Sequence, residues 1–382
     1  MWRDKSGENI QTSGKKLNLK IAFLGARGIP ACYGGFDTFV EELSIKLVES
    51  NAVQVLVYCR SSYYKNQPKS YQGVNLIYIP SSRIKALESL FHSFLSSLNV
   101  LWKKVDVIFF VDPANAPFCA LLRLFGKRVI IHTDGLGWRR RKWGSLARRY
   151  YKFTEWLCSR TANVLITDNP VMQEYYKQEY GADSVYISYG AESKYGVDNT
   201  VYKEFGISPS NYLLVVARLE PENNTDFVIE EYVRSKVNLP LVVVGDSPYD
   251  HKYMDNLKEG AGERVFFLGR IDDQAKLNAL YKGAYLYIHG HEVGGTNPSL
   301  LRAMEAGVAP LVIDIPFNIA VIGDAGFVFK RVRGNLTDIL EWLVDNPRQI
   351  REKAQVAKSH MESCFTWNKV ANNYVRLFRQ IV

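Results

Sequence analysis

The stretch LKIAFLGARGIPACYGGFDTFVEELSIKL, residues 19–47, decides the fold class. Its first six residues, Leu19–Leu24, form an apolar run typical of a buried strand. A glycine-rich loop follows, and apolar side chains then recur at helical spacing at Phe36, Phe39, Val40, Leu43 and Leu47. A strand, a glycine-rich turn and an amphipathic helix in this order predict the first unit of a parallel sheet covered by helices.

The same alternation continues along the chain. Strands of the first half are expected at Leu19–Leu24, Val53–Cys59, Val74–Ile79, Val105–Val111, Lys127–His132, Asn163–Thr167 and Ser184–Ser188. After a polar stretch at residues 189–209, a second series is expected at Tyr212–Ala217, Leu241–Val244, Arg264–Leu268, Ala284–His289, Ala309–Ile313 and Gly326–Phe329. The pattern predicts two doubly wound, Rossmann-like α/β domains, with a ligand cleft beyond the carboxyl ends of their strands.

The domain boundaries follow from this rhythm. We expect a disordered leader at residues 1–18, an N-terminal domain at 19–190 and a C-terminal domain at 191–365. A last amphipathic helix within residues 366–382 is expected to dock on an apolar surface, because its apolar side chains share one face.

Composition narrows the class of protein. The chain has 382 residues, 47% of them hydrophobic and 23% charged, which is typical of a globular protein. Five scattered cysteines without a C-x-x-C pair favour reduced thiols in a cytoplasm and argue against a zinc site. No apolar run is long enough to span a bilayer, and residues 1–19 lack the apolar core of a secretory signal. A formal charge of +9 favours anionic partners.

Two glycine-rich loops are candidate phosphate or sugar sites. Gly34 and Gly35 open the first helix, where backbone N–H groups and the helix N-terminus favour negative charge. In the second half, Thr296 or Asn297 can cap a helix that begins near Pro298, with Ser299 beside them. A tight structural turn and an ordinary helix start are the alternatives for the two loops.

Charged residues at strand ends are expected in the cleft. Arg218 follows the first strand of the second half, and a guanidinium there can bind a diphosphate through two bonds. Glu222 stands near the next helix start, where compensation of the helix dipole is an equally good explanation. Asp134 follows the fifth strand of the first half and can bind sugar hydroxyls or orient an acceptor hydroxyl. His132, two residues earlier, is expected to be a hydrogen-bonded core histidine.

A basic segment between residues 138 and 152 is the candidate contact with the acceptor or a membrane. It contains no acid and combines aromatic with basic residues: Trp138, Arg139, Arg140, Arg141, Lys142, Trp143, Arg148 and Arg149. A solvated charged face is one explanation, and single-stranded nucleic acid is another. Because no nucleic-acid-binding motif accompanies the segment, we favour anionic lipid headgroups or a lipid-linked diphosphate over nucleic acid.

Several long blocks resemble a known family. RGIP and YGGF within residues 27–36, VARLEPENN at residues 216–224 and GGTNPS at residues 294–299 resemble the rhamnosyltransferase-like branch of retaining glycosyltransferase family 4. DGLGW at residues 134–138 and FTW at residues 365–367 are similar to further stretches of that branch.

The resemblance implies a GT-B fold in which the last helix crosses back to the N-terminal domain. It implies retaining transfer without a metal or cofactor, from a nucleotide sugar such as dTDP-rhamnose to a lipid-diphosphate-linked saccharide in cell-surface polysaccharide assembly. Arg218 and the helix start at Thr296–Ser299 would hold the diphosphate, while Asp134, Arg139 and Glu222 would line the reaction centre. The enzyme would work in the cytoplasm, peripheral to the inner membrane face.

Two positions differ from the family pattern. Arg302 stands where the family has a glutamate that binds the nucleotide ribose, and Glu305 one turn later could substitute for it. Ala320 replaces a further acid. These differences leave two alternatives open: a transferase with another donor such as a UDP-hexose, or a transferase-like subunit that binds without turnover.

Overall fold

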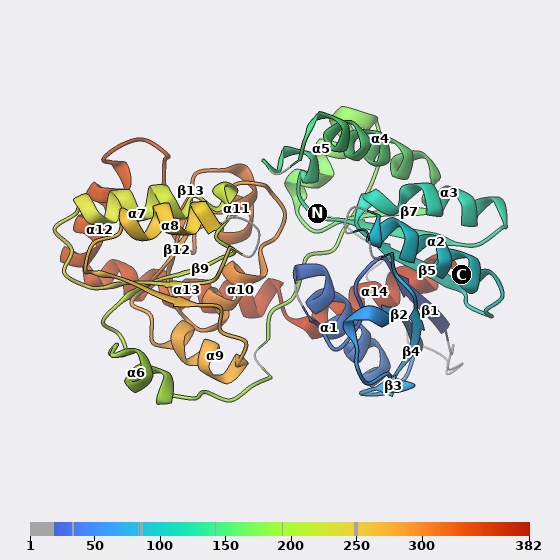
Figure 1. Ribbon diagram of the computed structural model, residues 1–382, viewed down its shortest axis with the longest axis horizontal. Coiled ribbons are helices and arrows are strands. Elements are labelled where there is room, and N and C mark those ends of the chain that lie inside the picture. Colours follow the sequence, from blue (N-terminus) through green and yellow to red (C-terminus); the bar gives the residue numbers. More distant parts are fainter. Residues whose placement is uncertain are drawn as a thin grey trace, which may run out of the picture.

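The computed structural model describes residues 19–382, except residues 33, 83, 85, 86, 142, 193 and 248–250. The expected leader at residues 1–18 and Lys142 therefore lie outside the described residues. Two α/β units lie side by side, with the first half of the chain in one and most of the second half in the other (Figure 1).

The N-terminal sheet has the strand order β3-β4-β2-β1-β5-β6-β7-β8, and every pair except β3 with β4 is parallel. Its strands are β1 (Leu19–Leu24), β2 (Val53–Arg60), β3 (Ser70–Tyr71), β4 (Val74–Ile79), β5 (Val107–Val111), β6 (Val129–Thr133), β7 (Val164–Thr167) and β8 (Val185–Tyr186). Its helices are α1 (Gly35–Glu49), α2 (Glu88–Leu101), α3 (Ala116–Leu124), α4 (Ser145–Thr161) and α5 (Pro170–Tyr180), with short 3₁₀ turns η1 (Ser61–Tyr63), η2 (Pro113–Asn115) and η3 (Gly137–Arg139).

The C-terminal sheet is parallel throughout, in the order β11-β10-β9-β12-β13-β14. Its strands are β9 (Leu213–Val216), β10 (Leu241–Val244), β11 (Val265–Gly269), β12 (Leu286–His289), β13 (Pro310–Ile313) and β14 (Phe327–Phe329). The remaining helices are α6 (Thr200–Phe205), η4 (Pro221–Asn223), α7 (Thr225–Arg234), α8 (His251–Glu259), α9 (Gln274–Lys282), α10 (Pro298–Glu305), α11 (Pro316–Ile322), α12 (Asn335–Asp345), α13 (Pro347–Cys364) and α14 (Trp367–Ile381).

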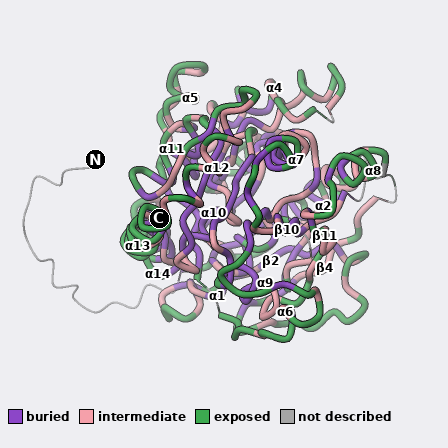
Figure 2. Tube along the Cα trace, turned by 90° about the vertical axis from the view of Figure 1, so that its left-hand side faces the viewer, coloured by how far each residue is buried: buried purple, intermediate pink, exposed green. Residues whose placement is uncertain are grey.

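Local chemistry explains where these elements begin and end. In α5, the Asn169 side chain accepts a hydrogen bond from the Val171 N–H at 2.9 Å, Pro170 takes the first helical position, and Gly181 ends the helix with φ 63°. The central strands are buried on both faces because helices cover both sides of each sheet, and Figure 2 shows the buried segments gathered in the sheets.

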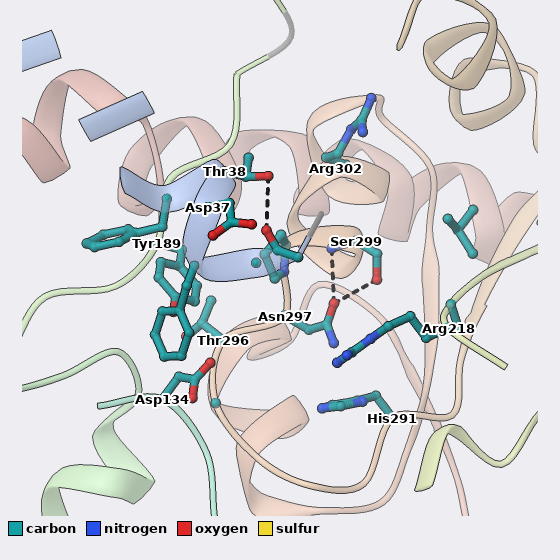
Figure 3. Close-up of a pocket in the computed structure, with 18 of the residues that line it drawn as sticks. Asp37, Thr38, Asp134, Tyr189, Arg218, His291, Thr296, Asn297, Ser299 and Arg302 are labelled. Atoms are coloured by element: carbon teal, nitrogen blue, oxygen red, sulfur yellow. Dashed lines mark hydrogen bonds between the residues drawn. The ribbon is translucent and has the colours of Figure 1, made fainter. Parts of the chain in front are cut away.

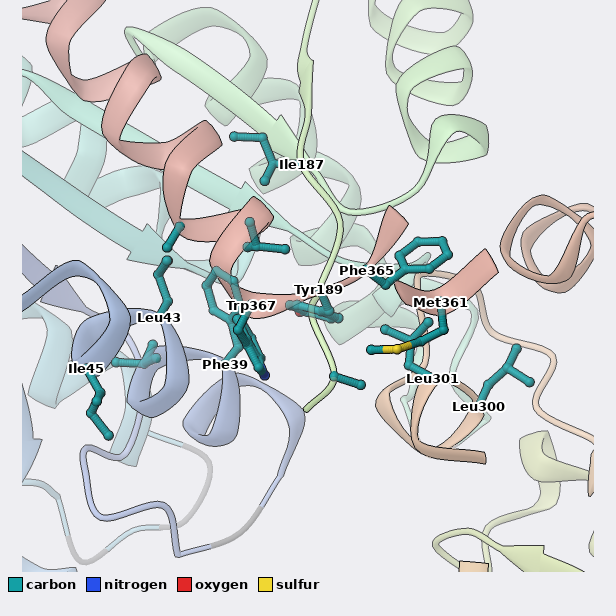
Figure 4. Packing of buried hydrophobic residues seen from close by; sticks show 14 of the residues in the cluster. Phe39, Leu43, Ile45, Ile187, Tyr189, Leu300, Leu301, Met361, Phe365 and Trp367 are labelled. Atoms are coloured by element: carbon teal, nitrogen blue, oxygen red, sulfur yellow. The ribbon is translucent and has the colours of Figure 1, made fainter. Parts of the chain in front are cut away.

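The last helix belongs to the N-terminal core. Helix α14 packs against α1, and the ring of Phe39 lies 6.2 Å from that of Trp367 and 6.0 Å from that of Tyr374 (Figure 4). His132 stacks on Phe39 at 4.6 Å in the same cluster. Contrary to the expectation, neither nitrogen of His132 has a hydrogen-bond partner among the described residues, and burial lowers the pKa of this histidine to about 3.

The chain therefore crosses between the sheets twice, once near residue 190 and once near residue 366. The two crossings lie in contact, because the Ala191 N–H donates to the Phe365 carbonyl at 2.8 Å. A Cβ on Gly190 would come within 2.7 Å of the Trp367 ring, so this close approach requires glycine.

Candidate active site

A cleft of about 900 Å³ lies between the two sheets and is lined by both. It receives loops from the carboxyl ends of β1, β5, β6 and β7 of the first sheet and of β9 and β12 of the second. Figure 3 shows Arg218 and His291 side by side, pointing toward the side of the cleft where Asp134 lies. This is the position at which doubly wound sheets bind ligands.

The loop between β1 and α1 forms one wall. Gly34 precedes α1 with φ 109°, a conformation that glycine adopts without strain. A Cβ added at Gly35 would lie 4.0 Å from the Pro298 ring of the opposite domain, so the two walls of the cleft are close here. Asp37 in the first turn of α1 accepts hydrogen bonds from the backbone N–H of Arg27 at 2.9 Å and from its guanidinium at 3.3 Å. Burial raises the pKa of Asp37, although Arg27 opposes that shift.

The facing wall is the start of α10. Asn297 caps this helix, since its side-chain oxygen accepts from the Ser299 N–H at 3.1 Å and from the Ser299 hydroxyl at 2.7 Å. The Ser299 hydroxyl in turn accepts from the Tyr287 hydroxyl at 2.9 Å. Asn297 and Ser299 both line the cleft, at the positive end of the helix dipole.

Thr296 has a different role from the one expected. Its N–H donates to the Asp168 carboxylate at 2.6 Å, and its hydroxyl donates to the Asp168 carbonyl at 2.5 Å. Thr296 is therefore engaged with the other domain and is only 2% exposed, so its side chain is not free to bind a diphosphate. Asn169 adds a further bond between the domains, from its amide to the Phe317 carbonyl at 3.2 Å.

Arg218 and Glu222, both expected at the site, have different surroundings in the structure. Arg218 is half-buried and lines the cleft, and its carbonyl accepts from the Asn223 side chain at 2.5 Å, which fixes the turn after β9. Glu222 is 4% exposed in η4 and is not among the residues that line the cleft. Its neighbour Asn223 does line the cleft, and the role of Glu222 at the reaction centre stays a prediction.

In the segment after β6, the arginine that lines the cleft is one residue later than expected. Asp134 lines the cleft with Arg140, whereas Arg139 is exposed, with its guanidinium 5.2 Å from the Trp138 ring, and does not line the cleft. The turn η3 causes this difference, because it directs consecutive side chains to different sides. Burial raises the pKa of Asp134 against the opposing charges of Arg140 and Arg218. Of these two neighbouring arginines, Arg140 is the one that lines the cleft.

The remaining basic segment is partly buried. Trp138 donates from its indole N–H to the Tyr175 hydroxyl at 3.3 Å and carries the Lys152 ammonium 4.5 Å above its ring. The Trp143 ring lies 5.6 Å from that of Tyr151 and is half-buried. Among the described residues of the segment, the exposed basic ones are Arg139, Arg141, Arg148 and Arg149. Trp138 and Trp143 do not form the exposed aromatic surface that the sequence suggested.

Arg302 lies at the cleft, on α10. Its guanidinium donates to the side-chain oxygens of Gln274 at 2.9 Å and Asn278 at 2.6 Å, and it lies 5.2 Å from the Tyr281 ring. Glu305 is half-buried near the end of the same helix but does not line the cleft, so it is not placed to substitute at the ribose position. Ala320 is exposed on α11 and also lies outside the cleft lining.

Several polar residues of the cleft were missed in the sequence, and three of them closely follow strands. Asp112 and Asp168 stand directly after β5 and β7, and His291 stands two residues after β12. Burial raises the pKa of Asp112 to about 6. Burial, with Arg140 and Arg218 nearby, lowers the pKa of His291 to about 4, so this imidazole is neutral near pH 7. Their positions after strands were the available signal.

Among the described residues, no group of three or more His, Cys, Asp or Glu side chains is arranged to hold a metal ion. In the same part of the chain, no helix combines the length and the apolar character that crossing a bilayer requires.

This architecture, with two Rossmann-like domains around an interdomain cleft, is the GT-B class of glycosyltransferase fold. Sucrose-phosphate synthase from Thermosynechococcus elongatus is similar with a TM-score of 0.79 at 16% identity, over 95% of this chain and 99% of that one. Anabaena Alr3699/HepE, solved in complex with UDP and glucose, is similar with a TM-score of 0.77 at 14% identity, over 95% of this chain and all of that one (100%). The predicted fold class is confirmed.

Sequence comparison divides the chain at the same place. Residues 19–192 match the family described as domain of unknown function DUF1972, and residues 200–359 match glycosyl transferases group 1. The second half of the chain is therefore a glycosyl transferases group 1 domain. The O-antigen chain mannosyltransferase B of Escherichia coli is 26% identical over 178 residues, which are 44% of this chain and 46% of that protein. The chain spans less than half the length of the curated relatives it matches.

Proposed function

We propose that the protein transfers a sugar from a nucleotide diphosphate to an acceptor hydroxyl, with retention at the anomeric carbon. One observation carries the proposal: the cleft brings Arg218 and the capped start of α10 from one domain opposite Asp134 and Arg140 from the other. Cations and a helix N-terminus suit a diphosphate leaving group, and a carboxylate suits sugar hydroxyls.

The chemistry needs positive charge more than a strong base. The bond between the anomeric carbon and the phosphate oxygen breaks, a bond to the acceptor oxygen forms on the same face, and the acceptor proton passes to the departing phosphate. Negative charge develops on the diphosphate, and Arg218 with the positive end of α10 is placed in advance to stabilise it. Asp134 orients sugar or acceptor hydroxyls, and Arg140 balances its charge. No metal ion or cofactor has a part in this proposal.

For the substrates, we propose dTDP-rhamnose as donor and a lipid-diphosphate-linked saccharide as acceptor, in the assembly of a cell-surface polysaccharide. The sequence resemblance supports this choice, and the match to an O-antigen mannosyltransferase agrees with a polysaccharide product. We propose that the enzyme works in the cytoplasm, peripheral to the inner face of the membrane, where such acceptors are exposed. Nucleic acid is not an expected partner.

A second donor class has its own support. Arg302 occupies the position expected of a ribose-binding glutamate, and its contacts with Gln274 and Asn278 hold a cation there. Alr3699/HepE, of the same fold, was solved with UDP and glucose. A UDP-hexose is therefore the alternative donor, and a binding subunit without turnover is the alternative to an enzyme.

The test is product formation, read by mass spectrometry, from a synthetic GlcNAc-diphosphate-lipid with dTDP-rhamnose or with a panel of UDP-hexoses. The Arg302→Glu variant is assayed beside the parent. A rhamnosylated product from the parent supports the proposal, and product with a UDP-hexose alone replaces the donor. Nucleotide binding without product from any donor, in both proteins, contradicts the proposed enzyme and favours the binding subunit.

A further inference from the structure

Helix α2 has its polar side toward the sheet and its apolar side toward solvent, which is the opposite of an ordinary surface helix. Its side toward the N-terminal sheet is small and polar, and the fully buried residues are His92, Ser93, Ser96, Ser97 and Val100. Its outer side carries an apolar stripe at helical spacing, which extends one residue beyond each end of the helix. The exposed fractions are 51% at Leu87, 44% at Phe91, 42% at Phe94, 40% at Leu98 and 89% at Trp102. An ordinary surface helix has its apolar side toward the core and its polar side toward solvent.

The polar side of α2 is hydrogen-bonded in part, although Nδ1 of His92 and the Ser93 hydroxyl have no partner among the described residues. The Ser97 hydroxyl donates to the Ser93 carbonyl at 2.6 Å, and the Tyr58 hydroxyl of β2 donates to the Asn99 side chain at 2.9 Å. Small side chains let the helix approach the sheet closely, so the outward position of the stripe is fixed by packing.

The apolar surface extends over the neighbouring helices. Helix α3 packs against both α2 and α4 (Figure 1). The Phe94 and Phe118 rings lie 6.3 Å apart. Exposed side chains on α3, α4 and the turn after α3 continue the stripe: Leu124, Phe125, Leu146, Phe153 and Trp156. We call this set, with the α2 stripe, the α2–α4 face. Apolar surface of this extent on a folded protein marks an interaction site.

Most of the exposed charges that border the α2–α4 face are positive. Exposed cations border it at Lys103, Lys104, Arg123, Arg128, Arg148 and Arg149. The acids of these three helices and of the turns that follow α2 and α3 are engaged or buried. Glu88 lies 3.8 Å from Arg60, Asp106 accepts from the Lys20 N–H at 2.8 Å, and Glu155 is fully buried.

We infer that the α2–α4 face docks on an anionic lipid bilayer, with its Phe, Leu and Trp side chains entering the headgroup region and its cations contacting the lipid phosphates. Aromatic and leucine side chains bordered by Lys and Arg are the composition of an interfacial membrane surface. A second copy of the chain is a poorer occupant, because the same face would bring like charges together.

The position of the face suits the proposed function, on which its biological purpose rests. Helix α2 begins beyond the carboxyl end of β4, and α4 begins beyond that of β6, so both start at the edge of the sheet that borders the cleft. The face also reaches Trp102 and Phe125 at the opposite edge of the sheet, so docking lays α2 and α4 along the bilayer. The N-terminal domain, which forms one wall of the cleft, would then rest on the surface where a lipid-linked acceptor would be found.

The experiment measures binding of the full chain to vesicles of phosphatidylglycerol and phosphatidylethanolamine, with phosphatidylcholine vesicles as the uncharged comparison. In the Phe91→Ser/Phe94→Ser/Leu98→Ser variant, we expect the partition coefficient on anionic vesicles to fall about tenfold or more, because three apolar anchors are lost. A matched control removes three similarly exposed apolar residues of the C-terminal domain, Val332→Ser/Trp342→Ser/Val356→Ser, and should bind as the parent does.

Unchanged binding of the α2 variant overturns the inference, as does a change from dimer to monomer by light scattering, which would show that a second copy covers the face. Circular dichroism checks the fold, and Trp102→Ser is the second variant if the triple variant is misfolded. Turnover of a short, water-soluble acceptor separates the two proposals. The docking inference predicts that the α2 substitutions leave this turnover unchanged. If the parent protein binds vesicles but does not turn over the soluble acceptor, only the proposed function is contradicted.

Discussion

Two neighbouring arginines provide the sharpest test at the scale of single residues. Arg140 lines the cleft beside Asp134, whereas Arg139 is exposed against Trp138. Loss of a charge-assisted contact costs about 1.5–3 kcal/mol, so Arg140→Ala should lower kcat/KM by about 10- to 150-fold. Arg139→Ala should stay within about twofold, since exposed cations contribute little. Steady-state assays of both variants check this, and equal losses would restore Arg139 to the reaction centre.

Asp112 should leave a signature in the pH dependence of stability. Its folded pKa of about 6 lies above the ordinary value of 3.8 because the carboxyl is buried. Between these two pH values the folded protein holds a proton that the unfolded chain releases, so this group lowers the free energy of unfolding as the pH rises from 4 to 6. The total is about 3 kcal/mol for a shift of roughly two units.

The Asp112→Asn variant tests this sign, because an amide can still accept from the Ala114 N–H, as the carboxylate does at 2.9 Å. Urea unfolding should show the variant gaining stability over the parent between pH 4 and pH 7. A constant difference across that range would mean that Asp112 titrates normally.

The residue scale is also where sequence reasoning reaches its limit. Asp134 and Arg218 could be placed in the cleft because each follows a strand, and the same argument would have found Asp112, Asp168 and His291. The choice between Arg139 and Arg140 could not be made, because it depends on the rotation of η3. For Thr296, no local pattern could show that Asp168 of the other domain accepts its hydrogen bonds.

Among the elements, the start of α10 allows capping to be separated from ligand binding. Asn297→Ala removes the acceptor for the Ser299 N–H and should destabilise the C-terminal domain by about 1 kcal/mol. Asn297→Asp keeps a good cap but places a negative charge where the diphosphate is proposed to bind. Thermal unfolding and nucleotide titration check the pair: the Asp variant should keep its stability and lose nucleotide affinity. An Asp variant that binds UDP and dTDP like the parent would contradict diphosphate binding at α10.

Most elements could be predicted from the sequence. Short runs of β-branched residues indicate buried parallel strands when segments with a helical pattern separate them. Strand β3, only Ser70–Tyr71, was missed, since two polar and aromatic residues carry no period. Helix α2 shows a different limit. A stripe of Leu and Phe indicates an amphipathic helix, but which side faces the sheet is decided by how the serines pack, and this emerges only in three dimensions.

For the whole molecule, the contact between the two chain crossings predicts a difference between two glycines. Gly190→Ala would place a Cβ within 2.7 Å of the Trp367 ring, and overpacking of this kind costs about 1–3 kcal/mol. Gly196→Ala is the matched control on the same connecting segment, because a Cβ there has no neighbour within 4 Å among the described residues. Thermal unfolding should show a lower midpoint for Gly190→Ala alone, and equal midpoints would mean that the crossings separate easily.

The return of α14 to the first domain has a consequence for biosynthesis. A chain emerges from the ribosome with its N-terminus first, and an N-terminal domain can usually fold while the rest is still being made. Here Phe39 and Phe109 lack their partners Tyr374 and Phe378 until the final helix has emerged. While the second domain is being made, the first domain therefore exposes the apolar surface that α14 later covers. Exposed apolar surface of this kind is what chaperones bind. Maturation of the first domain is completed only after translation has passed residue 378.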